Sequence, residues 1–413
     1  MTKTKRGDIM NYRKYLATVA VGFSLTVGAS YAAEPILIGY VGDLSGACGP
    51  YNDGNLKATR IAVDEINAAG GLLGRKVELK VRDSKTNPEE ATKQARESII
   101  VDKADILTGP CTSSVMLADA AVAQEHKKLL WNSIGTTHRA NIDFGNRYVY
   151  QSVANSLMEG RALAEYAATQ KNWKRIATIG LDYEWPRQTI EMFTQRLKEL
   201  RPDVQIVGSV WPKLGESNFS SYIPVLLNEK PDVVFGVMFG SASSNFIRQG
   251  KTYGMFDRTK VFTYASTYLL KALGNDMPEG VHGWTRSPFY GIKSPAMDSF
   301  IARFKEAYKD VPDDESIAGY DSMMQMAAAI KQAKSLDADK LVDALSTLEY
   351  TGLRGKVKVR KLDISAYAPT FIGVTRKTPD YSFPILTDLV RIDGERVMPS
   401  EAEVARMRAS AKK

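Results

Sequence analysis

Histidine and cysteine are scarce in this chain, whose 413 residues include three histidines and two cysteines. The histidines, at positions 126, 138 and 282, do not have the spacing of a metal site, and no Cys-x-x-Cys pair is present. A Gly-x-Ser-x-Gly turn and a Walker phosphate-binding sequence are also missing. We therefore expect a protein that is not an enzyme and that needs neither a metal nor a cofactor.

Long apolar runs are absent beyond residue 32, where none reaches the roughly 18 residues that indicate a membrane-spanning helix. Before that point, an apolar segment over residues 16–27 follows five basic residues, Lys3, Lys5, Arg6, Arg13 and Lys14. Ser30 and Ala32 then supply the small side chains of a cleavage site. This order predicts a signal peptide over residues 1–32 and a periplasmic location. An uncleaved anchor is the alternative, and Met10 is an alternative start.

A strong charge of one sign is missing from the exported part. The whole chain has a formal net charge of +8, and residues 1–32 hold five cations and one anion, which leaves +4 for the remainder. Those charges stand in mixed-sign runs such as residues 75–83, which are typical of a solvated surface. We expect no nucleic-acid partner.

The two cysteines, Cys48 and Cys111, both belong to the exported part. An even number of cysteines in an oxidising compartment favours a disulfide. The two residues follow the first and third predicted strands, whose loops are neighbours in a doubly wound sheet, so the pairing is geometrically reasonable. Two buried free thiols are the alternative.

Predicted strands and helices alternate along most of the chain. In the first block, strands are expected over residues 36–41, 76–82, 104–108 and 129–133, and helices over 55–69, 88–101 and 113–126. In the second block, strands are expected over 175–180, 204–210, 232–238 and 260–264, and helices over 187–200, 222–228 and 243–253. Helices over 296–309, 316–333 and 337–347 and a strand-rich stretch over 355–391 follow. This alternation predicts an α/β protein with two open parallel sheets.

Ligands of open α/β sheets bind at the carboxyl ends of the strands. The loops expected there are rich in glycine, serine, threonine and aromatic residues and poor in catalytic groups: residues 42–55, 109–114, 133–138, 181–187, 239–243 and 265–268. Their composition favours ligand binding over catalysis.

An ordered set of motifs connects these loops: Gly42-Asp-Leu-Ser-Gly46, residues 62–71, Gly109-Pro-Cys-Thr-Ser-Ser114, residues 132–137, residues 182–186 and Gly319-Tyr-Asp321. Together they resemble the leucine/isoleucine/valine-binding family of type I periplasmic binding proteins, over essentially the whole exported chain. The resemblance implies two Rossmann-like lobes with parallel sheets, joined by a three-strand hinge, with the ligand cleft between them. It implies a receptor that closes on a small ligand and delivers it to an ABC permease in the inner membrane. A ligand sensor that regulates a protein partner is the alternative function.

The resemblance also implies how the lobes divide the chain. The N-terminal lobe would comprise residues 33–152 and 286–352, and the C-terminal lobe residues 153–285 and 353–413. The chain would cross between the lobes near residues 151–154, 284–287 and 350–355. We expect a monomer.

In relatives, hydroxyl and backbone N–H groups from two loops of the first lobe hold the ligand carboxylate. The matching residues here are Thr112, with Ser113 as a second possibility, and Thr137. A loop before a helix offers free N–H groups and the positive end of the helix dipole, although Thr112 and Ser113 could instead simply cap that helix. Gly135 matches a position whose carbonyl accepts a hydrogen bond from the ligand ammonium in amino-acid-binding relatives.

Aromatic residues match the remaining cleft positions. Tyr51 matches an aromatic residue on the first loop that covers the ligand. Trp185, flanked by Tyr183, and Phe239 match second-lobe tyrosines that close over the ligand. Ordinary packing is the alternative role for Tyr51 and Phe239.

Two positions depart from the family pattern. Ser266 stands where amino-acid binders carry the carboxylate that pairs with the ligand ammonium, so Asp182 or Glu184 would have to replace it. Cys111 matches a half-cystine whose usual partner position lies near Thr86, which leaves Cys48 as its partner here. We expect the ligand to be a small carboxylate with an apolar or aromatic body, with an apolar amino acid as an equal alternative.

Overall fold

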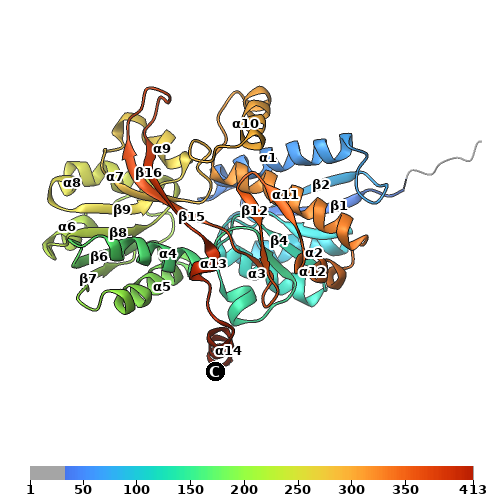
Figure 1. The fold of residues 1–413 in the computed structure, drawn as a ribbon, viewed down its shortest axis with the longest axis horizontal. Coiled ribbons are helices and arrows are strands. Elements are labelled where there is room, and N and C mark those ends of the chain that lie inside the picture. The colour runs from blue at the N-terminus through green and yellow to red at the C-terminus, as the bar shows by residue number, and fades with distance from the viewer. Residues whose placement is uncertain (1–32, 413) are drawn as a thin grey trace, which may run out of the picture. The chain divides into compact units, whose positions relative to one another are not determined.

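The computed structural model describes residues 33–412, so the predicted signal peptide lies outside the described residues. Residues 34–413 form one compact unit, which contains two seven-stranded sheets. We call each sheet with its helices a lobe (Figure 1). Within the described residues, no helix is both long enough and apolar enough to cross a membrane.

The first lobe is built on a sheet with the strand order β13-β14-β5-β4-β3-β1-β2. Its strands are β1 (Ile36–Gly42), β2 (Val77–Asp83), β3 (Ile106–Thr108), β4 (Leu129–Asn132), β5 (Val149–Gln151), β13 (Val359–Arg360) and β14 (Ser365–Ala366). Its helices are α1 (Gly49–Ala68), α2 (Pro88–Ile100), α3 (Ser113–Glu125), α11 (Asp314–Ala333) and α12 (Ala338–Leu345). Helices cover both faces of the sheet, which explains why β1 and β3 are almost continuously apolar.

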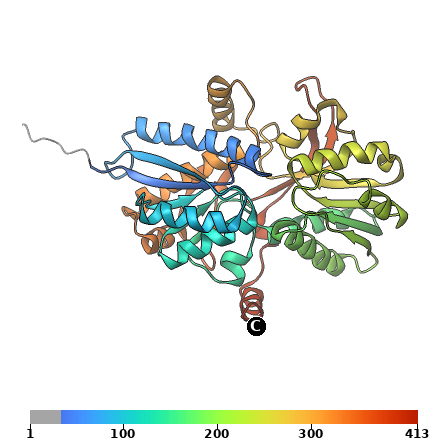
Figure 2. The same cartoon turned by 180° about the vertical axis from the view of Figure 1, so that it is seen from behind.

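The second lobe is built on a sheet with the order β16-β15-β10-β9-β8-β6-β7. Its strands are β6 (Arg175–Gly180), β7 (Gln205–Val210), β8 (Val233–Val237), β9 (Lys260–Tyr264), β10 (His282–Thr285), β15 (Thr370–Arg376) and β16 (Ile385–Ile392). Its helices are α4 (Ser156–Thr169), α5 (Glu184–Leu200), α6 (Tyr222–Asn228), α7 (Gly240–Thr252), α8 (Met255–Arg258) and α9 (Thr267–Leu273) (Figure 2). Strands β10, β15 and β16 pair antiparallel, whereas β6 to β10 are parallel.

The remaining elements lie against these two lobes. Helix α10 (Pro295–Tyr308) packs on the first lobe through Phe300, whose ring centroid is 4.7 Å from that of Tyr320 on α11. Helix α14 (Glu401–Ser410) contacts the π-helical turn η1 (Arg139–Asp143), and Arg408 donates a hydrogen bond to the carbonyl of Ile142. The short elements are η2 (Gly274–Asp276), β11 (Tyr350–Gly352), β12 (Gly355–Val357) and α13 (Gly394–Val397).

The α/β alternation expected from the sequence is confirmed, and several elements differ in their bounds. Helix α1 begins at Gly49 rather than residue 55, because its first turn reads as a glycine- and proline-rich loop in the sequence. In the fold, Tyr51 and Asn52 of this turn are buried, and the Asn52 side chain accepts a hydrogen bond from the Asp43 N–H and donates one to the Gly109 carbonyl. Elements β5, α4 and α9 have no counterpart among the expected elements.

The chain passes between the lobes three times. It leaves the first sheet after β5 and returns after β10, in the regions that the resemblance implies. The last passage differs from the expected one near residues 350–355, because β13 and β14 still belong to the first sheet and β15 begins the return to the second. Residues 353–366 therefore lie with the first lobe, whereas the expected division places them in the second.

Candidate functional site

A small cavity of about 30 Å³ lies where the two lobes meet. The first lobe contributes Cys48, Tyr51, Cys111, Ser113, Ile134, Thr136 and Glu315. Tyr183, Trp185, Phe239 and Tyr264 come from the second lobe, and Arg286 from the segment that follows β10. Most of these residues stand at the carboxyl end of a strand or in the loop after it, where α/β sheets bind ligands. This volume is far below the roughly 300–1,000 Å³ of small-molecule sites, so a ligand enters only if the lobes move apart.

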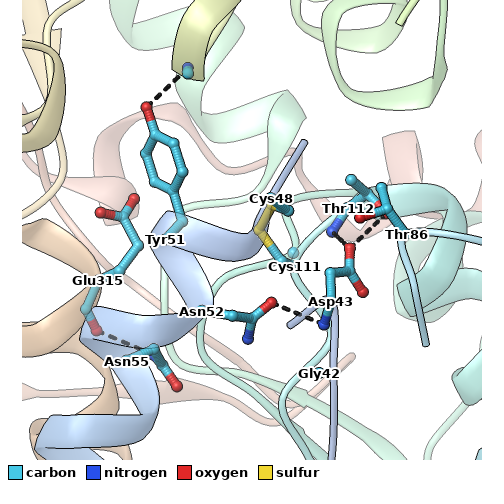
Figure 3. The surroundings of a disulfide bond; sticks show 12 residues. Gly42, Asp43, Cys48, Tyr51, Asn52, Asn55, Thr86, Cys111, Thr112 and Glu315 are labelled. Atoms are coloured by element: carbon cyan, nitrogen blue, oxygen red, sulfur yellow. Dashed lines mark hydrogen bonds between the residues drawn. A yellow bond between two sulfur atoms is a disulfide. The ribbon is translucent and has the colours of Figure 1, made fainter. Parts of the chain in front are cut away.

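The predicted disulfide between Cys48 and Cys111 is confirmed, and it forms part of the cavity wall. Its two Cα atoms are 6.3 Å apart, and 63 positions separate the cysteines in the sequence. Cys48 directly precedes α1 and Cys111 stands just before α3, so the bond ties the starts of two helices together (Figure 3). Thr86, near the usual family partner position, instead donates a hydrogen bond to the Ser45 carbonyl.

The loops around the disulfide are held by Asp43, a fully buried carboxylate at the end of β1. The Thr112 N–H and hydroxyl both donate to Asp43 Oδ2, at 2.8 and 2.9 Å (Figure 3). The Ser84 hydroxyl donates to Asp43 Oδ1 at 2.6 Å. Thr112 does not line the cavity, and Asp43 accepts the only proton of its hydroxyl. Its contact with a ligand carboxylate stays a prediction.

Ser113, the second possibility for the carboxylate contact, does line the cavity. It is the first residue of α3, and its Oγ is buried with no hydrogen-bond partner among residues 33–412. Thr136 also lines the cavity, and the sequence reasoning missed it.

Three other expected site residues lie outside the cavity lining. The Gly135 carbonyl accepts a hydrogen bond from the Asn132 side chain, and the Thr137 hydroxyl donates to Glu184 Oε1 at 2.9 Å. Ser266 caps α9, and its Oγ lies 3.5 Å from the Tyr51 hydroxyl. The polar groups of these three residues thus already have partners within the protein.

An aromatic wall, formed by Tyr51, Tyr183, Trp185, Phe239 and Tyr264, surrounds the cavity as the resemblance implies for its first four members. Phe239 lies at the centre of the wall, with ring centroids 5.6 Å from Tyr51 and 6.2 Å from both Tyr183 and Trp185. Edge-to-face contacts of this kind are a favoured arrangement of aromatic pairs and stabilise the wall.

Two sets of hydrogen bonds join the lobes across the cavity. The N–H of Gly240, at the start of α7, donates to the Tyr51 hydroxyl at 2.9 Å. Glu184, at the start of α5, accepts from the Thr137 hydroxyl and lies 3.3 Å from Arg139 Nη1. The structure therefore has the lobes closed on each other. These contacts occupy Glu184, and Asp182 forms an exposed ion pair with Arg187, so neither acid lines the cavity.

Arg286 is a buried cation of the cavity wall, and the sequence reasoning missed it. Its Nε donates to Glu159 Oε1 at 2.6 Å, and Trp185 Nε1 donates to the other oxygen of the same carboxylate at 2.8 Å. Burial acts against the charged guanidinium, but Glu159, Tyr264 and Glu315 together outweigh it, and the pKa of Arg286 lies above its ordinary value. Arg286 therefore stays charged.

Glu315 is a second missed residue of the wall, placed there by the second position of α11. Its Oε1 accepts from the Tyr264 hydroxyl at 3.0 Å and lies 4.0 Å from Arg286 Nη1. Burial, together with Asp313 and Asp314, raises the pKa of Glu315 well above its ordinary value. A sequence signal did exist, since Asp313, Asp314 and Glu315 form an acidic helix start, but helix N-termini commonly carry acids for capping alone.

Comparison with known proteins agrees with this architecture. The chain is 23% identical over 344 residues to the leucine-, isoleucine-, valine-, threonine- and alanine-binding protein of Pseudomonas aeruginosa, an alignment that covers 83% of this chain and 89% of that protein. A periplasmic binding protein of Burkholderia mallei has a similar structure, with a TM-score of 0.82 and 20% identity over 92% of this chain and 99% of that one. So does an ABC transporter solute-binding protein of Rhodopseudomonas palustris, crystallised with 3,4-dihydroxybenzoic acid, with a TM-score of 0.80 and 18% identity over 89% of this chain and 99% of that one.

Residues 35–377 match the sequence profile of a family described as periplasmic binding proteins. The match spans well over half of the chain and includes every strand of the two sheets except β16, as well as every residue that lines the cavity. It confirms the resemblance seen in the sequence motifs. The chain belongs to this family of periplasmic binding proteins, a family of receptors rather than enzymes.

Proposed function

We propose that this chain is the periplasmic solute-binding component of an ABC importer, exported by a cleaved signal peptide and acting as a monomer. Its ligand is a small carboxylate with an apolar or aromatic body: an apolar amino acid or an aromatic carboxylate. The names of the relatives support both classes, because one binds aliphatic amino acids and another was crystallised with a dihydroxybenzoic acid. The observation that carries the proposal is the small cavity between the lobes, which is lined by aromatic side chains.

The ligand carboxylate would lie at the start of α3. Ser113 Oγ is buried there without a hydrogen-bond partner within residues 33–412. The N-terminus of this helix adds unpaired N–H groups and a positive dipole end, both of which favour an anion. The aromatic wall would enclose the apolar body, and exclusion of water would favour the closed state. The closed lobes would then present the surface that docks on the inner-membrane permease.

Thermal unfolding with and without candidate ligands tests the proposed function. We expect leucine, phenylalanine, benzoate or 4-hydroxybenzoate to raise the melting temperature, since a ligand at about 100 times its Kd stabilises a protein by roughly 2.7 kcal/mol. The ligand should be recovered unchanged, because a receptor does not consume it. If no compound of either class changes the melting temperature, the proposed ligand class is wrong.

Replacement of Ser113 by alanine separates ligand binding from folding. We expect the affinity for the ligand to fall about ten- to a hundred-fold, because a hydrogen bond to a charged group contributes roughly 1.5–3 kcal/mol. The stability of the ligand-free protein should not fall, because Ser113 Oγ has no partner within the described residues. Isothermal titration calorimetry and urea unfolding measure the two quantities.

Thr112→Val is the matched control, since it removes a hydroxyl at the adjacent position. Here we expect the ligand-free protein to lose about 1–3 kcal/mol of stability, because the buried Asp43 loses a donor. An unchanged affinity in Ser113→Ala would show that the carboxylate binds elsewhere.

A further inference from the structure

The proposed contact between Ser113 and the ligand carboxylate does not use one polar atom of the cavity wall, Glu315 Oε2. Glu315 Oε2 is buried and has no hydrogen-bond partner among residues 33–412. The other oxygen of this carboxylate accepts from the Tyr264 hydroxyl, so the two oxygens differ in their surroundings. The Glu315 side chain is 3% exposed and lines the cavity, and Figure 3 shows it beside Tyr51. A buried acceptor without a donor is costly, and a donor on the ligand would remove that cost.

The charges around Glu315 indicate which kind of donor fits. Three further acids lie near it: Asp313 and Asp314 on the same helix start, and Glu159 across Arg286. Asp314 already accepts from the N–H groups of Thr267, Arg286 and Ser287 and from the Thr285 hydroxyl.

Arg286 is the nearest cation to Glu315, and its Nε pairs with Glu159. Four acids thus stand around one guanidinium. A ligand cation would reduce this excess of negative charge, whereas a neutral hydroxyl would leave it unchanged.

We infer that Glu315 binds the ammonium group of the ligand, which makes the ligand an apolar amino acid rather than a carboxylate without an amino group. This inference rests on the proposed function, which allows both classes. The ligand then lies with its carboxylate toward Ser113 and its ammonium toward Glu315, and the aromatic wall encloses its side chain. Glu315 is the residue that determines specificity between the two classes.

The number of protons released on binding is a second measurement that tests the role of Glu315. Burial, Asp313 and Asp314 raise the pKa of Glu315 in the ligand-free protein, while Arg286 and the Tyr264 hydroxyl act in the opposite direction. Tyr51, on α1, is a further titratable group beside this carboxyl (Figure 3). An ammonium that enters beside Glu315 stabilises its ionised form, so amino-acid binding should release a proton from Glu315. A carboxylate without an amino group should cause no such release.

The experiment compares Glu315→Gln with the wild-type protein on matched ligands. The pairs are phenylalanine with 3-phenylpropanoate, leucine with 4-methylpentanoate, and 4-hydroxybenzoate with benzoate. Titration calorimetry near pH 7, in two buffers with different ionisation enthalpies, gives the affinity and the number of protons released. Glu306→Gln is the control, because Glu306 is an exposed acid on α10.

We expect an amino acid to bind the wild-type protein at least tenfold more tightly than its deaminated partner and to release a proton. Glu315→Gln should lose about ten- to a hundred-fold in amino-acid affinity and the proton release, while the affinity for the deaminated partner stays within about threefold. Glu306→Gln should behave as the wild type.

Several outcomes would overturn the inference and leave the proposed function standing. One is that Glu315→Gln weakens both members of a pair equally, which indicates a structural role. Another is that the deaminated acid binds as tightly as the amino acid. A third is that only 4-hydroxybenzoate depends on Glu315, which would make the donor a hydroxyl. If the wild-type protein binds none of the six compounds, the proposed function itself fails, and the inference fails with it.

Discussion

Replacement of Arg286 by leucine is expected to lower the free energy of unfolding of the ligand-free protein by about 3–5 kcal/mol. Glu159 is fully buried, and Arg286 is the cation that pairs with it. After the substitution, Trp185 Nε1 still donates to Glu159, but one neutral hydrogen bond does not compensate a buried negative charge. Urea unfolding without ligand measures the loss.

A second substitution shows whether the buried charge is the cause. Adding Glu159→Gln to Arg286→Leu removes that charge and keeps an oxygen for the Trp185 donor. The double variant should therefore be more stable than Arg286→Leu alone, by at least about 1 kcal/mol. Arg187→Leu is the control, because its ion pair with Asp182 is half exposed and should contribute less than about 1 kcal/mol. A loss of under 1 kcal/mol in Arg286→Leu would contradict the role assigned to this pair.

The second large effect is expected from the disulfide. Replacement of both Cys48 and Cys111 by alanine should lower the free energy of unfolding by about 4 kcal/mol, since the bond closes a long loop in the unfolded chain. Ligand affinity should fall as well, because both cysteines line the cavity and their bond holds the starts of α1 and α3 together.

Reduction of the wild-type protein provides an independent route to the same result. Dithiothreitol should lower the urea midpoint of the wild type toward that of the double variant, and it should leave the double variant itself unchanged. Alkylation under denaturing conditions without reductant should label neither cysteine. Labelling of both thiols in protein isolated from the periplasm would contradict the bond.

The order of the elements could be predicted from the sequence because it rests on local pattern. Alternating apolar strands and amphipathic helices repeat with periods that are visible over a dozen residues. The disulfide could be predicted for a related reason. Two cysteines that follow neighbouring strands of a parallel sheet come together whatever the details of packing.

The start of α1 and the last passage between the lobes could not be predicted in this way. Residues 49–54 form a helical turn because Tyr51 and Asn52 are buried against the rest of the lobe, although their composition is that of a loop. Strands β13 and β14 are two residues each, and they join the first sheet through pairing with each other and with β5. Such short segments carry no periodicity of their own.

The aromatic wall could be predicted from the sequence, whereas the polar part of the candidate site could not. Four of its aromatic residues follow strand ends in motifs that match the family: Tyr51, Tyr183, Trp185 and Phe239. Loops at these strand ends border the cleft, so large aromatic side chains on them are expected to line it. A hydroxyl or a carboxylate, in contrast, takes its role from the partner it meets. Thr112 meets Asp43 and is occupied, whereas the adjacent Ser113 is not.

The sequence by itself therefore determined the two sheets, the disulfide and the aromatic character of the cleft, because each of these follows from local pattern or from strand order. The tertiary structure alone decided that Arg286 and Glu315 share the cavity wall. Arg286 stands on a segment that crosses between the lobes, and Glu315 stands in the first turn of α11. No local sequence signal distinguishes the first from a surface ion-pair residue or the second from a helix-capping residue. Their surroundings come from the closed fold: Glu159 accepts from Arg286 and Trp185, and Glu315 accepts from Tyr264.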